Sequence, residues 1–161
     1  MSTRPIRLVA LDLDGTSLDG RGRLRPSTRQ AVDEASAQGV VVVVVTGRHH
    51  VLARPLHAEF GLTTPAVCCN GTYVYDFAEE RPLLARSMDK AKAREMVALC
   101  RRHDVHCLLY VRDAMTFEVA TPHLDGLAAW GNGFPERLRP RLEQVASFEA
   151  TIEAAPLVWK L

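Results

Sequence analysis

The sequence has almost no net charge, few cysteines and no long apolar run, and each shortage excludes a class of protein. Its 20 Lys and Arg residues nearly balance 19 Asp and Glu residues, so no basic surface predicts binding to nucleic acid. No apolar stretch is long enough to cross a membrane, and the first residues lack the apolar core of a signal peptide. We therefore expect a cytoplasmic protein without a nucleic-acid or membrane partner.

The 4 cysteines and 6 histidines show no metal-ligand spacing. The cysteines form no Cys-x-x-Cys pair, and the adjacent residues Cys68 and Cys69 are poorly placed for a disulfide. We predict reduced, mostly buried thiols, because free cysteine is among the most buried residue types. His49 and His50 are interpreted as the start of a helix, in preference to a metal site, and Pro55 is expected near the first turn of that helix.

An apolar run over residues 6–11 ends abruptly in two carboxylates, Asp12 and Asp14. Its length and aliphatic composition predict a parallel strand that is buried on both faces. Because side chains alternate along a strand, Asp12 and Asp14 leave it on the same side. Mg²⁺ suits such a pair, since it binds one or two carboxylates together with water and phosphate oxygens. The alternative is an ordinary turn in which both aspartates cap neighbouring amides.

A second strand repeats this arrangement. A helix is predicted over residues 26–39, and the valine strand that follows at residues 40–45 ends in Thr46, Gly47 and Arg48. The threonine hydroxyl can donate to a phosphoryl oxygen, the glycine permits close backbone approach, and the arginine offers a forked donor to an anion. On its own, the tripeptide is more typical of a structural turn.

Shorter elements follow along the rest of the chain. A third buried strand is predicted at residues 66–69 and ends at Asn70, before a hairpin of residues 72–77 and 82–86. The later patterns predict two helices capped by Asp89 and Thr121, a hairpin over residues 105–120 and a strand over residues 156–161. Between these, Leu142, Val145 and Ile152 indicate a helix and a short connection.

The aspartate segment resembles a known family. Asp12-Leu13-Asp14-Gly15-Thr16 resembles the first motif of the haloacid dehalogenase superfamily, and Thr46-Gly47-Arg48 after its strand resembles the second. The Asn-Gly turn, the hairpin and the α/β segment that follows resemble the Cof-type branch, whose mobile cap, called type IIB, is inserted after the third strand. Ser17 stands where the family usually has an apolar residue, and we expect this departure to affect packing more than chemistry.

The resemblance implies an α/β fold in two parts. Residues 1–80 would form the front part of a Rossmann-like core with a parallel sheet, and residues 81–161 an incomplete α+β cap. The family's later motifs, a lysine and a Gly-Asp-x-x-x-Asp acidic cluster, do not occur in the sequence, and Lys160 lies inside a predicted strand. We therefore expect a chain truncated at its C-terminus, whose exposed sheet edge offers a surface for self-association.

The activity implied is magnesium-dependent hydrolysis of a small phosphomonoester or sugar phosphate through an aspartyl-phosphate. Asp12 would be the nucleophile and Asp14 the general acid and base, and both would hold Mg²⁺. The residues implied to bind the phosphate are Thr46, Gly47, Arg48 and Asn70. A chain without the lysine and the acidic cluster is itself expected to be inactive or nearly so.

Other functions stay open at this point. Sucrose-phosphate phosphatases, mannosylglycerate-phosphate phosphatases and phosphomannomutases are sibling branches that share these front motifs. A phospho-accepting signalling domain also uses a strand-end aspartate, but it needs neither the second motif nor a cap. A truncated chain would alternatively persist as a non-catalytic module that binds a partner or oligomerises.

Overall fold

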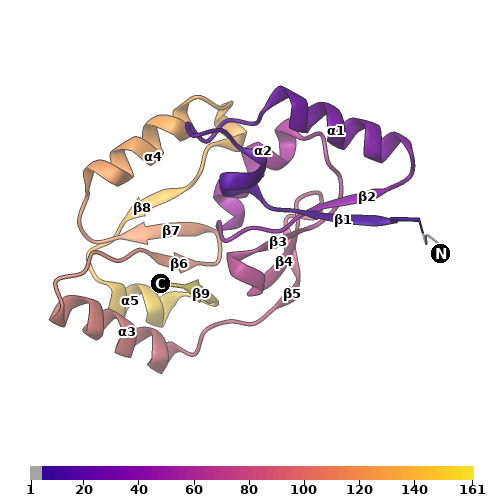
Figure 1. Cartoon of the computed structure of the whole chain (residues 1–161). Coiled ribbons are helices and arrows are strands. Elements are labelled where there is room, and N and C mark those ends of the chain that lie inside the picture. Colours follow the sequence, from indigo (N-terminus) through magenta and orange to yellow (C-terminus); the bar gives the residue numbers. More distant parts are fainter. Residues whose placement is uncertain (1–4) are drawn as a thin grey trace. The chain divides into compact units, whose positions relative to one another are not determined.

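The computed structural model describes residues 5–161 and shows a mixed α/β fold (Figure 1). The chain divides into two compact units. Among the described residues, unit 1 consists of residues 5–48 and Leu56–Leu84, and unit 2 of His49–Pro55 and Ala85–Leu161. The identification of the first part as an enzyme core and of the second as its cap stays a prediction.

Unit 1 is built on two parallel strands, β1 (Leu8–Leu11) and β2 (Val41–Val44), which pair along their whole length. Helix α1 (Pro26–Ala37) connects them, with Pro26 in its first turn, where proline is favoured. After the helix the chain reverses through Gly39, whose φ of 79° is readily accessible only to glycine. The strand, helix and strand predicted here are confirmed.

A third strand lies beside β2 in unit 1. Strand β3 (Ala66–Cys68) meets β2 through a parallel bridge between Val45 and Val67. It also pairs antiparallel with β4 (Tyr73–Asp76), and β4 neighbours β5 (Arg81–Ala85). The carboxyl ends of β1, β2 and β3 therefore lie next to one another, and the predicted hairpin after β3 is confirmed.

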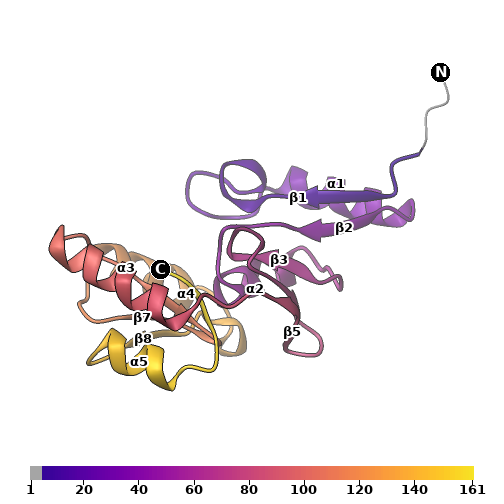
Figure 2. The ribbon, with the colours of Figure 1, turned by 90° about the horizontal axis from the view of Figure 1, so that it is seen from below.

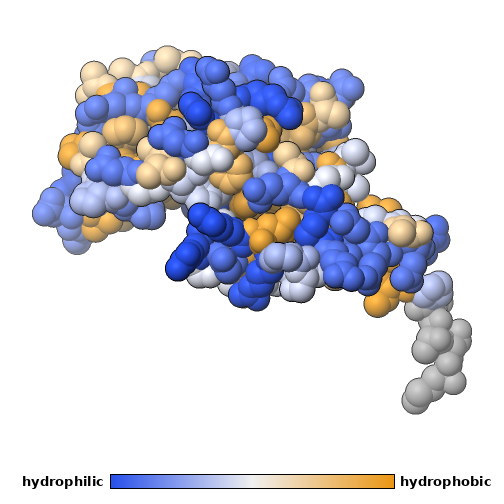
Figure 3. Space-filling model, turned by 90° about the horizontal axis from the view of Figure 1, so that it is seen from above, coloured by the Kyte–Doolittle hydropathy of each residue, from blue (hydrophilic) through white to orange (hydrophobic). Residues whose placement is uncertain are grey.

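Strand β1 is not buried on both faces, so this expectation is wrong. Leu8 is 56% exposed and Val9 36%, while Val41 on β2 is 46% exposed. Among the described residues β1 has one strand neighbour, and Figure 2 shows it at the outer edge of its sheet. Hydrophobic surface is visible near the N-terminal end of the described chain in Figure 3. The expected exposed edge is thus confirmed, whereas self-association stays a prediction.

Helix α2 (His50–Glu59) is shared between the two units. Its residues up to Pro55 group with unit 2, and the rest group with unit 1. Pro55 was predicted near the first turn of this helix, but it lies inside the helix. Because proline has no backbone N–H, it removes one helical hydrogen bond directly before the point at which the units divide.

Unit 2 contains a four-stranded sheet in the order β8-β7-β6-β9. Strands β6 (Leu109–Val111) and β7 (Ala114–Phe117) form the predicted hairpin. Strand β9 (Val158–Lys160) pairs antiparallel with β6, and β8 (Leu142–Gln144) pairs parallel with β7. Leu142 therefore lies in a strand and not in the helix that its spacing had suggested, because pairing with the distant strand β7 outweighs the local pattern.

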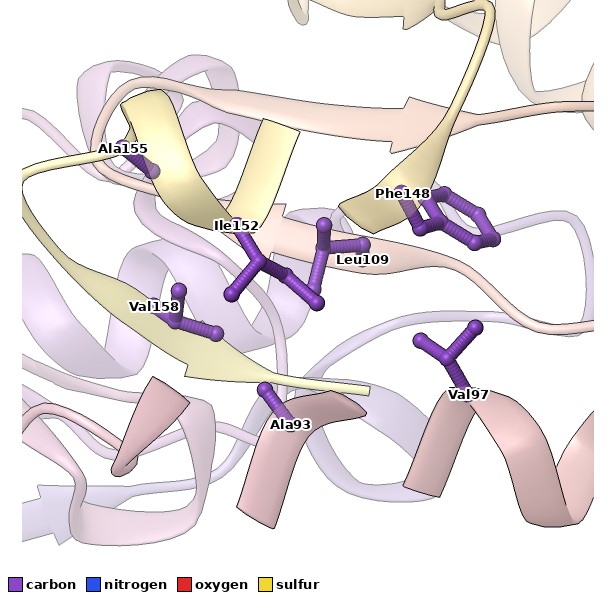
Figure 4. Packing of buried hydrophobic residues seen from close by; sticks show 7 residues of the cluster. All are labelled: Ala93, Val97, Leu109, Phe148, Ile152, Ala155 and Val158. Atoms are coloured by element: carbon purple, nitrogen blue, oxygen red, sulfur yellow. The ribbon is translucent and has the colours of Figure 1, made fainter. Parts of the chain in front are cut away.

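Helices cover both faces of this sheet. On one face, α3 (Lys90–Arg102) and α5 (Phe148–Ala154) enclose a hydrophobic cluster around Leu109 that Figure 4 shows. On the other face, Met115 packs with residues of α4 (Pro122–Asn132) and of the start of α2. Successive side chains of β6 point to opposite faces, so one strand serves both clusters.

The two longer helices of unit 2 begin at the predicted caps. Asp89 accepts hydrogen bonds from two backbone N–H groups at the start of α3, and Thr121 accepts one at the start of α4. A 3-10 turn, Glu136–Leu138, links α4 to β8. None of the helices in residues 5–161 is long and apolar enough to cross a membrane.

Candidate active site

Asp12 directly follows β1, and the chain then turns irregularly through Leu13–Ser17. Thr16 Oγ1 donates a hydrogen bond to Asp12 Oδ2 at 3.2 Å. The hydroxyl of Ser17, which is fully buried, donates to the backbone carbonyl of Asp12. The position of Asp12 is therefore fixed both at its backbone and at one carboxylate oxygen.

The role of Ser17 is one that sequence reasoning missed. We had expected this departure from the family pattern to affect packing more than chemistry. A buried hydroxyl must find a partner, because burying it without a hydrogen bond is costly, and it finds one in Asp12. The sequence did contain a signal for this role, because Ser17 places a hydroxyl at a position where the family usually has an apolar residue.

Asp14 and Arg48 form an ion pair with two hydrogen bonds. Arg48 Nε donates to Asp14 Oδ2 at 2.8 Å, and Arg48 Nη2 donates to Asp14 Oδ1 at 2.6 Å. The guanidinium hydrogen bonds hold the pKa of Asp14 below its usual value, against the smaller opposing effect of partial burial. Asp14 is consequently a carboxylate at neutral pH. The two guanidinium donors of Arg48, which we predicted to bind a phosphate, bind Asp14 in this structure.

Thr46 links the second and third strand ends. It is 3% exposed, and its backbone N–H donates to the carbonyl of Val67 at 2.9 Å. Its hydroxyl oxygen accepts the backbone N–H of Arg48 at 3.1 Å, and its carbonyl accepts the N–H of Asn70 at 3.1 Å. Because the Thr46 hydroxyl oxygen is the acceptor toward Arg48, its own proton can be donated elsewhere.

Gly47 and Asn70 are in direct contact. A Cβ atom on Gly47 would lie 2.7 Å from Asn70 Oδ1, a distance too short for any side chain. Asn70 itself has a φ of 57°, a left-handed conformation that asparagine tolerates better than most residues. Gly47 thus leaves room for the asparagine side chain, which a methyl group at this position would displace.

The structure brings the predicted residues to one edge of unit 1. The Asp14–Arg48 pair joins the first and second loops, and the Thr46–Asn70 hydrogen bond joins the second and third. Asp12 is tied to this set by the pairing of β1 with β2, where the N–H of Val45 donates to the carbonyl of Leu11 at 2.9 Å. The assignment of nucleophile, acid and phosphate ligands to these residues stays a prediction.

His49 and His50 mark the start of α2, as predicted, and lie in unit 2. His49 Nε2 is 2.8 Å from the carbonyl oxygen of Val111, and burial lowers the pKa of His49 to about 4. His50 Nε2 lies 3.8 Å from a carboxylate oxygen of Asp113. Within residues 5–161 no group of three or more His, Cys, Asp or Glu side chains is arranged to hold a metal ion.

Two carboxylates, a buried threonine and an arginine lie at the carboxyl ends of parallel strands, which is where α/β proteins bind their ligands. The sequence pattern of the haloacid dehalogenase-like hydrolases matches residues 9–144. The chain belongs to this family.

Individual relatives agree with this membership. The chain is 41% identical over 154 residues to the pyridoxal phosphate phosphatase YbhA of Escherichia coli, which covers 96% of the chain and 57% of that relative. It is 40% identical over 70 residues to the HMP-PP phosphatase of Serratia proteamaculans, covering 44% of the chain and 26% of that protein. The chain thus spans little more than half the length of the first relative.

Solved structures show the same fold. A haloacid dehalogenase-like hydrolase from B. subtilis superposes with a TM-score of 0.77 at 23% identity, over 96% of this chain and 59% of that one. A subclass IIB sugar phosphatase of the same superfamily superposes with a TM-score of 0.70 at 19% identity, over 94% and 56%. The expected α/β fold and the affiliation with the Cof-type hydrolases are confirmed, whereas the type IIB cap stays a prediction.

Proposed function

We propose that this chain carries the nucleophile and the phosphate-binding loops of a magnesium-dependent phosphomonoesterase, which works through an aspartyl-phosphate on Asp12. The observation that carries the proposal is the joining of three strand ends, with Asp14 and Arg48 paired across two of them. Membership of a hydrolase family, and the name of the 41% identical relative, support the same reaction class.

Asp12 is prepared for attack on phosphorus by its two hydroxyl partners. The hydrogen bond from Thr16 occupies Oδ2, so Oδ1 is the oxygen that faces an incoming phosphate. The bond from Ser17 restrains the backbone behind it. A carboxylate fixed in this way loses little further freedom when it reacts, which is the main contribution of positioning to the rate.

Asp14 must carry a proton before it can protonate the leaving oxygen, yet its pairing with Arg48 lowers its pKa. A phosphate ester is a dianion and competes for the same guanidinium fork. When Arg48 turns to the phosphate, the pKa of Asp14 rises, because its stabilising partner is lost. Substrate binding therefore converts Asp14 from a paired carboxylate into a general acid.

Thr46 and Asn70 would hold the phosphoryl group during transfer. The hydroxyl proton of Thr46 is not used toward Arg48 and can be donated to a phosphoryl oxygen. The exposed side chain of Asn70 lies next to Gly47 at the same edge. Loss of one such preorganised donor typically costs about 3 kcal/mol of transition-state stabilisation.

The donors at this edge fit Mg²⁺. Asp12 and Asp14 are exposed and offer hard oxygen ligands, and Mg²⁺ is commonly held by one or two carboxylates while it keeps several waters. Asp12 would hold the ion through its carboxylate and Asp14 through its backbone carbonyl, so that the Asp14 carboxyl can still carry a proton. The ion would supply positive charge against the phosphate oxygens. Arg48 and Thr46 supply the remaining charge and hydrogen-bond donors from the chain itself.

The substrate we propose to test first is pyridoxal phosphate, since the 41% identical relative is named for it. A sugar phosphate is the second class to compare. Both are small phosphomonoesters, so the same strand-end residues would serve either of them.

The test uses the 161-residue chain with p-nitrophenyl phosphate and pyridoxal phosphate, with Mg²⁺ and with a chelator. We expect slow hydrolysis that requires Mg²⁺ and falls to background in Asp12→Asn, because no other group replaces the nucleophile. Asp19→Asn is the matched control, since Asp19 is an exposed aspartate whose carboxylate accepts hydrogen bonds from the backbone of its own turn.

Hydrolysis that is equal in Asp12→Asn would contradict the proposal. Absence of hydrolysis in every sample would contradict catalysis by this chain and leave the non-catalytic module as its function. Binding of orthovanadate in the presence of Mg²⁺, measured by calorimetry, then decides whether the phosphate site exists, and Thr46→Val should weaken that binding about tenfold or more.

A further inference from the structure

Two of the four cysteines line one pocket of unit 2. The pocket has a volume of about 350 Å³, and Cys100, Cys107, Val97 and Phe148 are among its lining residues. That volume is at the lower end of the range for small-molecule sites. Val97 and Phe148 lie at the same end of the hydrophobic cluster in Figure 4. Both cysteines are partly exposed, so small reagents can reach them.

The turn that ends α3 brings these two cysteines together. The N–H of Val105 donates to the carbonyl of Cys100 at 2.9 Å, and the N–H of Asp104 donates to the carbonyl of Arg101 at 3.2 Å. Asp104 has a φ of 51°, so the pair of bonds is a Schellman motif, which reverses the chain over the last turn of the helix. Cys107 follows two residues after Val105 and lines the same pocket as Cys100.

The two thiols also interact directly. Burial raises the pKa of the Cys107 thiol to about 11, and the neighbouring Cys100 thiol adds to this rise. The thiolate is the form that attacks a disulfide, and the raised pKa of Cys107 disfavours that form at Cys107. Cys100 is therefore the attacking thiol of the pair, and Cys107 the resolving one.

The other cysteine pair has none of these properties. Cys68 and Cys69 are 0% and 2% exposed, and burial raises the pKa of Cys68. The thiol of Cys69 lies 3.7 Å from the hydroxyl of Tyr73. These two thiols provide an internal control in the same chain.

We propose that Cys100 and Cys107 are a reversible redox site, at which a small disulfide of the glutathione class oxidises the pair to an intramolecular disulfide. The Cys100 thiolate attacks the small disulfide and releases one thiolate, which leaves a mixed disulfide on Cys100. The sulfur of Cys107 then attacks the sulfur of Cys100 and releases the second. In total, two protein thiols become one disulfide, and one small disulfide becomes two thiols. The inference is independent of the proposed phosphatase activity.

The test equilibrates the reduced chain with mixtures of oxidised and reduced glutathione, blocks free thiols with an alkylating reagent and maps tryptic peptides by mass spectrometry. Trypsin cleaves between the two cysteines at Arg101 and Arg102, so the disulfide joins peptides 95–101 and 103–112. We expect this joined pair to accumulate as the proportion of oxidised glutathione rises and to disappear with dithiothreitol. Cys68 and Cys69 should stay alkylated throughout.

Single variants separate the two roles. Cys107→Ser should retain the mixed disulfide on Cys100, at least about tenfold more of it than Cys100→Ser retains on Cys107, because the attacking thiolate is kept and the resolving thiol is removed. The proposal is overturned if the unmodified chain gives no joined peptides even in oxidised glutathione alone. It is equally overturned if Cys100 pairs between two chains, or if Cys68 and Cys69 oxidise first.

Discussion

The two units cover their sheets differently. In unit 1, β1 leaves Leu8 56% exposed, whereas in unit 2 Leu109 on β6 is 0% exposed, with helices on both faces of its sheet. The candidate active site nevertheless lies in unit 1, at the ends of the less covered strands. The difference separates two roles: substitutions at the unit 1 site should change activity, and substitutions in the unit 2 core should change stability.

The largest effect is expected from truncating the same side chain in each unit. Leu109→Ala should lower the free energy of unfolding by about 3 kcal/mol, because a fully enclosed leucine leaves a cavity. Leu8→Ala should cost less than about 1 kcal/mol, since its side chain is already largely in water. Urea unfolding measures both, and equal losses would show that the two sheets are equally packed.

Arg48→Gln tests the site without touching a core. The phosphate loses a forked donor, and residual Asp12-dependent hydrolysis should fall about a hundredfold. The pKa of Asp14 should rise, because the guanidinium that lowers it is gone, and NMR titration of the carboxylate measures this shift directly. Arg29→Gln is the control, since Arg29 pairs with Asp33 on α1, away from the strand ends. An unchanged Asp14 titration would refute the pairing.

The buried His49 should make unit 2 sensitive to acid. Burial lowers its folded-state pKa from 6.5 to about 4, so the folded state disfavours the proton that the unfolded state takes up. The stability that the neutral, buried His49 gives the folded state is therefore fully present above pH 6.5 and is lost as the pH falls toward 4. The free energy of unfolding should have fallen by about 2 kcal/mol at pH 5 for this reason. Unfolding at pH 7.5 and 5 should therefore show a smaller pH effect in His49→Gln than in the unmodified chain. The exposed His103→Gln should behave like the unmodified chain.

Gly47→Ala should have a smaller effect on the site. The added methyl group would meet Asn70 Oδ1 at 2.7 Å and displace the asparagine side chain. We expect orthovanadate binding to weaken about tenfold, as when one hydrogen bond to a charged ligand is lost. Gly20→Ala meets nothing within 4 Å and serves as the control. Equal affinity of both variants for orthovanadate would show that Asn70 does not take part in the phosphate site.

The smallest effect concerns the exposed edge of β1. If the chain self-associates there, Leu8→Lys should shift the sedimentation profile toward the monomer, because a charge on an edge strand opposes edge-to-edge pairing. Leu84→Lys is the matched control, since Leu84 is 63% exposed on β5. Self-association that responds equally to both substitutions would place the contact elsewhere.

The sequence determined most of the local structure. The caps Asp89 and Thr121, the first-turn Pro26 and the left-handed Gly39 act within one turn of chain, so their effects can be read without knowing the fold. The hairpin of β6 and β7 is equally local. The places of Asp12, Thr46 and Asn70 could also be predicted from the sequence, because the end of each apolar run marks the edge of a parallel sheet.

Only the tertiary structure decided which distant groups meet. Leu142 joined a strand because β7 lies beside it, and β1 stayed exposed because burial depends on what packs against a strand and not on its own composition. The fork of Arg48 bonds to Asp14, 34 residues away in the chain, and no periodicity encodes that contact. The sequence determines which side chains are present, and the packing of the chain determines which of them come into contact.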